Sequence, residues 1–279
     1  MIIERRKIFY IISLILLIPG IASLFVNQLN LGIDFRGGSI VHVRMAVDVT
    51  APEVREALAP VGLDNSEVQK SADNTYYIRT HELDQEQTRN LLNALQTKFG
   101  EVELMSAESV GATIGRELTR NAALALLIGI ALMLVYISLR FEWTFGVAAV
   151  LALVHNVLVV LGVFSIFQWE VNTPFIASIL TIIGFTINDT IVVFDRVREN
   201  MRSSKKQDYA ALLNKSILQV VNRSINTVLT AVIILVALLL LGGATLKLFV
   251  VAMLIGFVVG AYTSICIASP LWYELKKAV

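Results

Sequence analysis

The sequence predicts an α-helical membrane protein, with six transmembrane helices and a ferredoxin-like α+β extracytoplasmic domain inserted after the first helix. Of its 279 residues, 56% are hydrophobic and only 16% are charged, a composition that soluble domains do not have. Apolar runs of about 17 to 25 residues recur along the chain, as membrane-crossing helices require. A polar stretch of about 90 residues, enough for one small domain, follows the first run.

The six apolar runs define the expected membrane spans. They cover residues 8–26, 122–139, 143–167, 175–194, 225–241 and 248–271. The first run has a basic start, as a signal peptide has, but it exceeds the usual signal core of about 7–15 residues, so we expect a retained span. The expected organisation is a first helix in residues 1–26, an extracytoplasmic domain in residues 27–118 and a five-helix bundle in residues 119–279.

Basic residues predict the orientation of these spans. On one side lie Arg5, Arg6, Lys7, Arg140, Lys276 and Lys277, together with Arg196, Arg198, Arg202, Lys205, Lys206, Lys215 and Arg223 of the loop after the fourth run. On the other side, residues 168–173 contain no basic residue and residues 242–247 contain one. The positive-inside rule therefore places both termini in the cytoplasm and the polar domain outside.

Alternating strand and helix signals in the polar stretch predict the order βαββαβ. Strands are expected at residues 40–45, 67–71, 75–80 and 102–107, one helix at 52–58 with Thr50 as its cap, and a second from the cap Asp84 to Phe99. This is the order of the ferredoxin-like split motif, a fold that hosts many functions and so assigns none. The preceding segment, residues 32–39 (GIDFRGGS), is interpreted as a shaped junction, because glycines permit tight turns. A phosphate-binding loop is the weaker alternative.

Asp189, within the fourth apolar run, is the main candidate functional residue. A carboxylate at membrane depth costs about 2.5–3.5 kcal/mol on insertion scales, so such a residue usually faces a bundle interior and has a function there. Residues three and four apart share a helix face. This spacing places Thr186 and Thr190 on the face of Asp189, with Asn188 beside them.

The fifth run carries two further polar rows. Asn226 lies in one of them, between Asn222 and Thr230, and Arg223 begins the row beside it. We expect Asp189 and Arg223 to approach each other directly or through water. One interpretation is a structural ion pair or a snorkelling arginine. The other is a proton relay, in which Asp189 changes its protonation as the helices rearrange.

Other intramembrane residues allow two interpretations each. His155, midway along the third run, is either a titratable member of the relay or a hydrogen-bonding packing residue. Gly256 and Gly260 form a small-xxx-small pair, which favours close helix approach within the chain or with a partner subunit.

No nucleophile lies at a suitable spacing from a base, and His42 and His81 lack metal-ligand spacing, so we expect no enzymatic activity, cofactor or metal. The net charge of +1 gives no indication of nucleic acid binding.

Three motifs resemble those of a known family. Residues 187–200 (INDTIVVFDRVREN) closely resemble the signature of SecF, the smaller membrane subunit of bacterial SecDF protein-export complexes in the resistance-nodulation-division superfamily. Residues 32–39 are similar to the motif that follows its first span, and residues 222–224 (NRS) resemble the arginine motif that opens its fifth span. The order of spans agrees as well. One departure is His155-Asn156, where the family usually has His-Asp.

The resemblance implies a function and partners. It implies a proton-motive-force-coupled accessory subunit of the bacterial inner membrane, acting with SecD on preproteins that emerge from the SecYEG channel, with YajC and membrane lipid as further partners. Proton-pathway roles carry over to Asp189 and Arg223, with Asn188 as a neighbour; Thr186 and Asn226 are expected to support them. Two alternatives remain, a proton-driven exporter of small molecules and a passive scaffold of the translocon.

Overall fold

The computed structural model describes residues 2–71, 73–203, 208–243 and 246–278. Lys205 and Lys206 of the predicted basic loop lie outside these residues. The chain divides into two compact units. One comprises Met1–Asn30 with Ala123–Val279, and the other comprises Leu31–Ala122. They are described separately below as the membrane unit and the outer unit.

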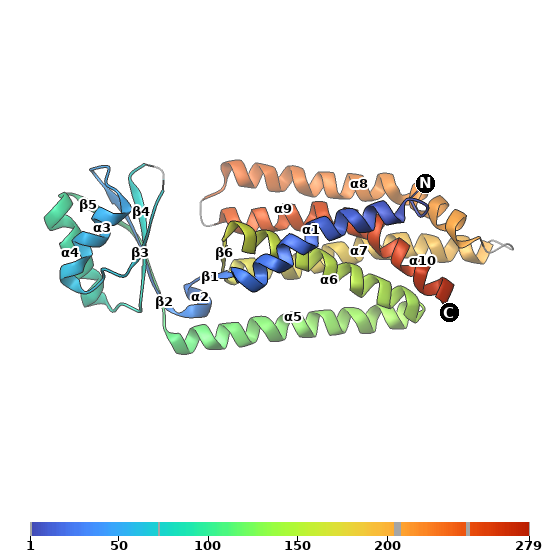
Figure 1. Ribbon diagram of the computed structural model, residues 1–279, viewed down its shortest axis with the longest axis horizontal. Coiled ribbons are helices and arrows are strands. Elements are labelled where there is room, and N and C mark those ends of the chain that lie inside the picture. Colours follow the sequence, from blue (N-terminus) through green and yellow to red (C-terminus); the bar gives the residue numbers. More distant parts are fainter. Residues whose placement is uncertain (1, 72, 204–207, 244–245, 279) are drawn as a thin grey trace. The chain divides into compact units, whose positions relative to one another are not determined.

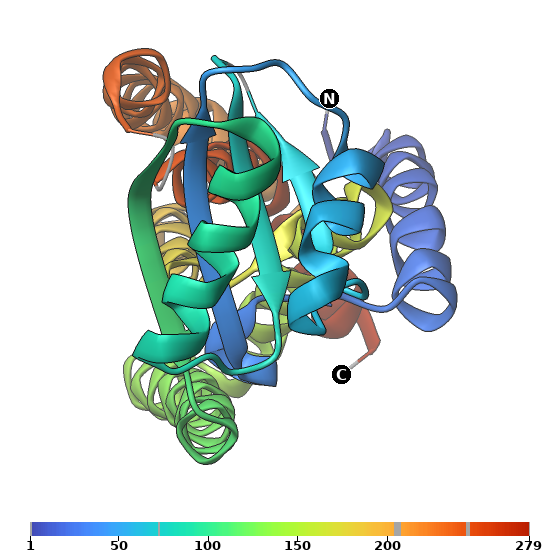
Figure 2. The ribbon, with the colours of Figure 1, turned by 90° about the vertical axis from the view of Figure 1, so that its left-hand side faces the viewer.

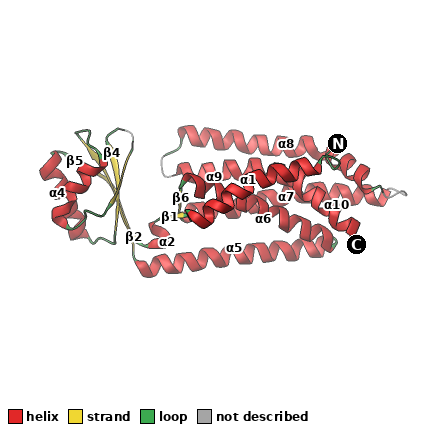
Figure 3. Ribbon diagram, viewed as in Figure 1, coloured by secondary structure: helices red, strands yellow, loops and turns green. Residues whose placement is uncertain are grey.

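The membrane unit is almost entirely helical (Figures 1 and 3). Its helices are α1 (Arg6–Val26), α5 (Ala112–Arg140, which begins in the outer unit), α6 (Trp143–Phe167), α7 (Thr173–Ser203), α8 (Tyr209–Leu241), α9 (Lys247–Thr263), the π-helical turn η3 (Ser264–Ala268) and α10 (Ser269–Ala278). The short strands β1 (Asn30–Leu31) and β6 (Glu170–Val171) follow α1 and α6. Within the described residues, six helices are long and apolar enough to cross a membrane, which confirms the predicted helical class with six spans.

Three helices extend well beyond the apolar runs that predicted them: α5 begins at Ala112, before the expected residue 122, and α7 and α8 are extended where they follow each other in the chain. α7 continues past Phe194 to Ser203, although the sequence turns polar there, and α8 begins at Tyr209, well before the expected residue 225. Asp208 caps α8 by accepting hydrogen bonds from the amides of Ala210 and Ala211. Hydropathy detects only the apolar part of a helix, whereas caps and side-chain contacts set its ends.

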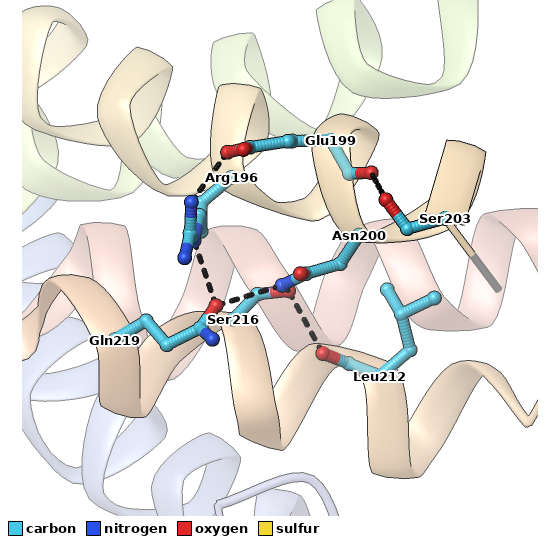
Figure 4. Close-up of polar contacts among 7 residues, drawn as sticks. All are labelled: Arg196, Glu199, Asn200, Ser203, Leu212, Ser216 and Gln219. Atoms are coloured by element: carbon cyan, nitrogen blue, oxygen red, sulfur yellow. Dashed lines mark hydrogen bonds and ion pairs between the residues drawn. The ribbon is translucent and has the colours of Figure 1, made fainter.

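Polar side chains join the extensions of α7 and α8 to each other (Figure 4). Arg196 Nε donates to Gln219 Oε1 at 2.7 Å. Asn200 Nδ2 donates to the same oxygen at 2.9 Å and to Ser216 Oγ at 2.8 Å. The polar residues that end the apolar runs therefore bind one another and keep both segments helical.

Small residues allow the helices of the membrane unit to approach closely. α1 packs on α6, and α9 packs on α6, α7 and α8. A Cβ atom placed on Gly256 would lie 2.4 Å from Ile182 Cδ1, and one on Gly260 would lie 2.6 Å from Thr186 Oγ1. This glycine face is therefore filled by α7 of the same chain, which decides between the two interpretations of the small-xxx-small pair.

The outer unit contains a four-stranded antiparallel sheet with two helices over one face (Figure 2). Its elements are α2 (Ile33–Arg36), β2 (Gly38–Met45), α3 (Ala51–Leu58), η1 (Ala59–Val61), β3 (Glu67–Lys70), β4 (Thr75–Thr80), α4 (Gln85–Phe99) and β5 (Val102–Val110). The sheet order is β3-β4-β2-β5. With β1, α2 and η1 added, the element order differs from a plain βαββαβ series, and the ferredoxin-like class stays a prediction.

Local signals of the outer unit correspond to observed geometry. Capping boxes form at Thr50 and at Asp84, as the sequence predicts. Asp73 and Asn74 have φ of 55° and 53° in the connection between β3 and β4, where Asn and Asp tolerate the left-handed region. At the glycine motif, Gly38 has φ of 121°, and a Cβ atom there would lie 2.5 Å from the carbonyl oxygen of Thr80. This close backbone approach favours the junction interpretation of the motif.

Tyr76 links the core of the outer unit to the loop between β2 and α3 by two hydrogen bonds. Its ring is fully buried among core residues, and its hydroxyl accepts from the Val49 amide at 2.9 Å and donates to the Val49 carbonyl at 2.8 Å. Replacing Tyr76 by phenylalanine leaves both buried backbone groups without this partner, so we expect a loss of about 1–3 kcal/mol in unfolding free energy. Hydrogen exchange of residues 31–122 in the full chain measures this loss. The control is Tyr77→Phe, on the opposite face of β4; equal effects of the two changes would contradict the prediction.

Candidate functional site

Asp189 lies in the interior of the membrane unit. Its residue is only 6% exposed, and its Oδ1 accepts a hydrogen bond from Ser224 Oγ of α8 at 2.7 Å. Thr186 and Thr190, the predicted members of its helix face, are 1% exposed each. The spacing rule therefore identified the buried face of α7 correctly.

Asp189 and Arg223, which we expected to approach each other, do not bind each other directly. Within the described residues, no hydrogen bond or ion pair joins them; Ser224, the next residue in the chain, binds the carboxylate instead. Consecutive helical residues point about 100° apart, so Ser224 faces the Asp189 carboxylate directly, while Arg223 lies at the edge of the α7–α8 contact, where it lines a cavity together with Ile191 and Val192 of α7. Arg223 is exposed, and so are Asn226 on α8 and Asn188 on α7. The structure thus brings Asp189 and Thr186 together in the interior and leaves these three predicted site residues solvent- or cavity-exposed.

A second polar cluster surrounds Thr186 where α6, α7 and α9 meet. Asn156, 1% exposed, donates from Nδ2 to Thr186 Oγ1 at 2.8 Å and to the Gly256 carbonyl at 3.1 Å. One turn further along α7, the hydroxyls of Thr190 and Ser264 lie 2.9 Å apart. Asn156 is thus a hydrogen-bonding junction of three helices.

His155 lies beside this cluster, against the turn η3. Its Nδ1 is 3.2 Å from Thr263 Oγ1, the last residue of α9 before the π-helical turn. Single π-helical turns inside α-helices occur frequently at functional sites. Here the turn begins at Ser264, so two consecutive hydroxyls contact two different helices: Thr263 contacts α6, and Ser264 contacts α7.

Three buried polar atoms of this region have no hydrogen-bond partner among the described residues. They are Asp189 Oδ2, His155 Nε2 and Asn156 Oδ1. An unsatisfied buried polar group costs about 1–3 kcal/mol, so a bundle that only needed to be stable would pair these atoms or replace them with apolar groups. The arrangement can bind a proton at Asp189 and hydrogen-bond a neighbouring polar molecule. Within the described residues, no group of three or more potential ligands could hold a metal.

Sequence reasoning missed the most direct partner of Asp189. Ser224 differs from the apolar residues that line the same α8 face, Val220 and Val228, and this difference was the available signal. Thr263 and Ser264 gave no such signal, because serine and threonine are common packing residues of membrane helices.

Ser224 is expected to stabilise the contact of α7 with α8. Replacing it by alanine leaves both carboxylate oxygens of Asp189 without a donor, so we expect a loss of about 1–3 kcal/mol in unfolding free energy. Thermal unfolding of the full chain in detergent measures this loss. Ser203→Ala is the matched control, because among the described residues the Ser203 hydroxyl binds the Glu199 carbonyl of its own helix and no group of another helix. Identical midpoints for the two variants would show that the contact contributes nothing.

Two family models match the chain. Residues 90–278 match the C-terminal region of the protein export membrane proteins SecD and SecF. Residues 22–48 match the SecD/SecF GG motif, which includes the glycine segment at residues 32–39.

Relatives and solved structures agree with these matches. The SecF translocase subunit of Sebaldella termitidis is 41% identical, over 98% of this chain and 91% of the relative. That of Acidaminococcus fermentans is 38% identical, over 99% and 97%. The crystal structure of SecDF from Thermus thermophilus superposes with a TM-score of 0.90 at 35% identity, covering 99% of this chain and 38% of that longer one. The buried aspartate thus lies in a six-span chain whose whole length follows these subunits, and the chain belongs to the SecF family of protein translocase subunits.

Proposed function

We propose that this chain is a proton-coupled accessory subunit of protein translocation. The relatives that match it along nearly its whole length are named protein translocase subunits, and this supports a role in protein translocation. The single observation that carries the proton coupling is Asp189, a carboxylate buried at membrane depth with one oxygen unpaired. In this proposal the chain is not an enzyme, because it moves protons and polypeptide without changing a covalent bond.

Two opposing effects act on the charge of Asp189. Burial in a low-dielectric bundle favours the neutral carboxyl, whereas the hydrogen bond donated by Ser224 favours the carboxylate. A movement of α8 relative to α7 breaks or restores the hydrogen bond from Ser224. Asp189 takes up a proton when the bond is broken and releases it when the bond forms again. The membrane potential supplies about 2.3 kcal/mol per charge per 100 mV for this cycle.

The surface of α8 supports a partner within the membrane. Asn222, Arg223 and Asn226 are all exposed in the isolated chain, and polar side chains that face lipid are costly. We assign SecD as the subunit that covers them, because the relatives of Thermus thermophilus and Bacillus subtilis are single SecDF chains of which this chain matches 38%. Arg223 then lies between the two subunits, next to the helix pair that holds Asp189.

We also propose a fold class for the outer unit and a membrane orientation for the chain. We assign the outer unit to the ferredoxin-like class, because two helices cover one face of its antiparallel β3-β4-β2-β5 sheet. The positive-inside rule places this unit outside the cytoplasm and both termini inside. There the outer unit contacts preproteins that emerge from the SecYEG channel.

Reconstituted vesicles test this function. Vesicles with SecYEG and SecD, with or without the chain, are supplied with a preprotein, and its translocation is measured with and without an imposed proton gradient. We expect the chain to increase translocation only when the gradient is present. Equal stimulation after an ionophore has removed the gradient would identify the chain as a passive scaffold.

A further inference from the structure

A cavity of about 950 Å³ opens where the ends of α5, α7 and α8 meet. Five arginines line it: Arg140, Arg196, Arg198, Arg202 and Arg223. The only acidic residues among its described lining are Asp195 and Glu199. Five positive charges against two negative charges leave a formal charge of +3 on the cavity wall.

The two carboxylates are already paired within the cavity wall. Arg196 binds Glu199, and Arg198 Nη2 lies 3.2 Å from Asp195 Oδ1. Within the described residues, no carboxylate pairs with Arg140 or Arg202. The excess positive charge therefore belongs to side chains that remain available to an external anion.

The paired arginines are held in fixed positions. Arg198 Nη1 donates to the Arg140 carbonyl at the end of α5, at 3.0 Å, and its guanidinium lies 5.2 Å from the centre of the Phe141 ring. Arg196 is held by Gln219 of α8 (Figure 4). Side chains of α7 thus bind both the end of α5 and α8 at the cavity wall.

Apolar surface adjoins the positive charge. A second cavity of about 440 Å³ shares Arg140, Arg198 and Arg202 with the first and is also lined by Leu139 and by Glu142, whose carboxylate pairs with Lys276. Leu139 is 84% exposed, and an exposed apolar stripe continues from it along α5 through Val135 and Leu132. A ligand seated here contacts guanidinium groups at one end and an apolar helix face at the other.

We propose that this cavity binds the phosphate headgroup of an anionic phospholipid, with the acyl chains along α5. The guanidinium fork matches phosphate oxygens in pairs, and basic pockets between membrane helices on the cytoplasmic side suit acidic headgroups. The positive-inside rule places the cavity at the cytoplasmic leaflet. An acidic protein segment would satisfy the charge but not the adjoining apolar stripe.

Native mass spectrometry of the full chain, released from vesicles of phosphatidylglycerol and phosphatidylcholine, tests this site. The test variant is Arg140→Gln with Arg202→Gln, which removes the two unpaired charges shared by both cavities. Because each basic residue near an anionic surface contributes about 1 kcal/mol, we expect retained phosphatidylglycerol to fall roughly tenfold or more. The variant Arg140→Lys with Arg202→Lys keeps both charges but not the guanidinium fork, so we expect retention between that of the unchanged chain and that of the glutamine variant. It also shows whether the fold tolerates changes at these positions.

The matched control is Arg5→Gln with Lys277→Gln, which removes two exposed charges of the same membrane side outside the cavity. We expect the control to keep its phosphatidylglycerol. Equal retention by test and control variants overturns the proposal. Displacement of the lipid by an equimolar amount of soluble glycerol phosphate also overturns it, because the site would then recognise a free anion. SecD is assigned to the α8 face that carries Arg223, and the lipid headgroup to Arg140 and Arg202 of α5 and α7. Loss of the lipid when SecD binds therefore overturns the proposal in favour of a protein occupant.

Discussion

Replacing Gly162 by leucine is expected to separate α1 from α6. A Cβ atom on Gly162 would lie 2.7 Å from the Cα of Gly20, and one on Gly20 would lie 2.9 Å from the Cα of Gly162. Both neighbours are backbone atoms, which cannot move aside as a side chain can. Overpacking of a core typically costs about 1–3 kcal/mol, and we expect this change to reach or exceed the upper value.

A disulfide assay reports this separation directly. The hydroxyls of Ser23 and Ser165 are 2.8 Å apart across the same contact, so the pair Ser23→Cys and Ser165→Cys, with Cys266→Ser to remove the native thiol, is expected to cross-link on oxidation. We expect Gly162→Leu to abolish the cross-link. Gly184→Leu is the control, because a Cβ atom on Gly184 meets nothing within 4 Å. Cross-linking at full yield in the Gly162 variant would contradict the close contact.

Replacing Asp189 by asparagine is expected to abolish proton-coupled translocation while the complex stays assembled. Asparagine has nearly the same shape, and its amide oxygen still accepts the Ser224 hydroxyl, but it cannot take up a proton. Positioned proton-transfer groups contribute factors of about 100 or more, so we expect proton flux in vesicles with SecD to fall by about this factor. Co-purification with SecD checks that the complex is intact.

The same helix provides the control for this variant. Asp195→Asn also removes one carboxylate from α7, but Asp195 is partly exposed and pairs with Arg198. We expect its proton flux to stay close to that of the unchanged chain. If the Asp189 variant retained full gradient-dependent translocation, the chain would be a scaffold and the buried carboxylate would have only a structural role.

The sequence predicted the helices and their buried faces better than it predicted the contacts between helices. Apolar run length located every span, and the spacing of Thr186, Asp189 and Thr190 identified the buried face of α7, because both follow from local periodicity. The partner of Asp189 depends on how α8 is rotated about its axis. A rotation of about 100° exchanges Ser224 for Arg223, and the packing of several helices decides between them.

The helix ends and the polar cluster around Thr186 could likewise not be predicted from local periodicity. The polar extensions of α7 and α8 are helical because Arg196 and Asn200 of α7 both bind Gln219 of α8. Such a pairing between distant segments leaves no periodic signal in either segment. Asn156 likewise contacts Thr186 and the Gly256 carbonyl, partners that only the assembled bundle brings together.

The turn η3 has a consequence for how α9 can move. A π-helical turn contains one more residue than an α-helical turn, so α9 and α10 do not share one continuous angular register. If the extra residue shifts along the helix, the hydroxyls near it rotate while the rest of α9 keeps its packing. Thr263 and Ser264 can therefore exchange the side chains they contact on α6 and α7 through a local rearrangement, without any helix having to leave the bundle.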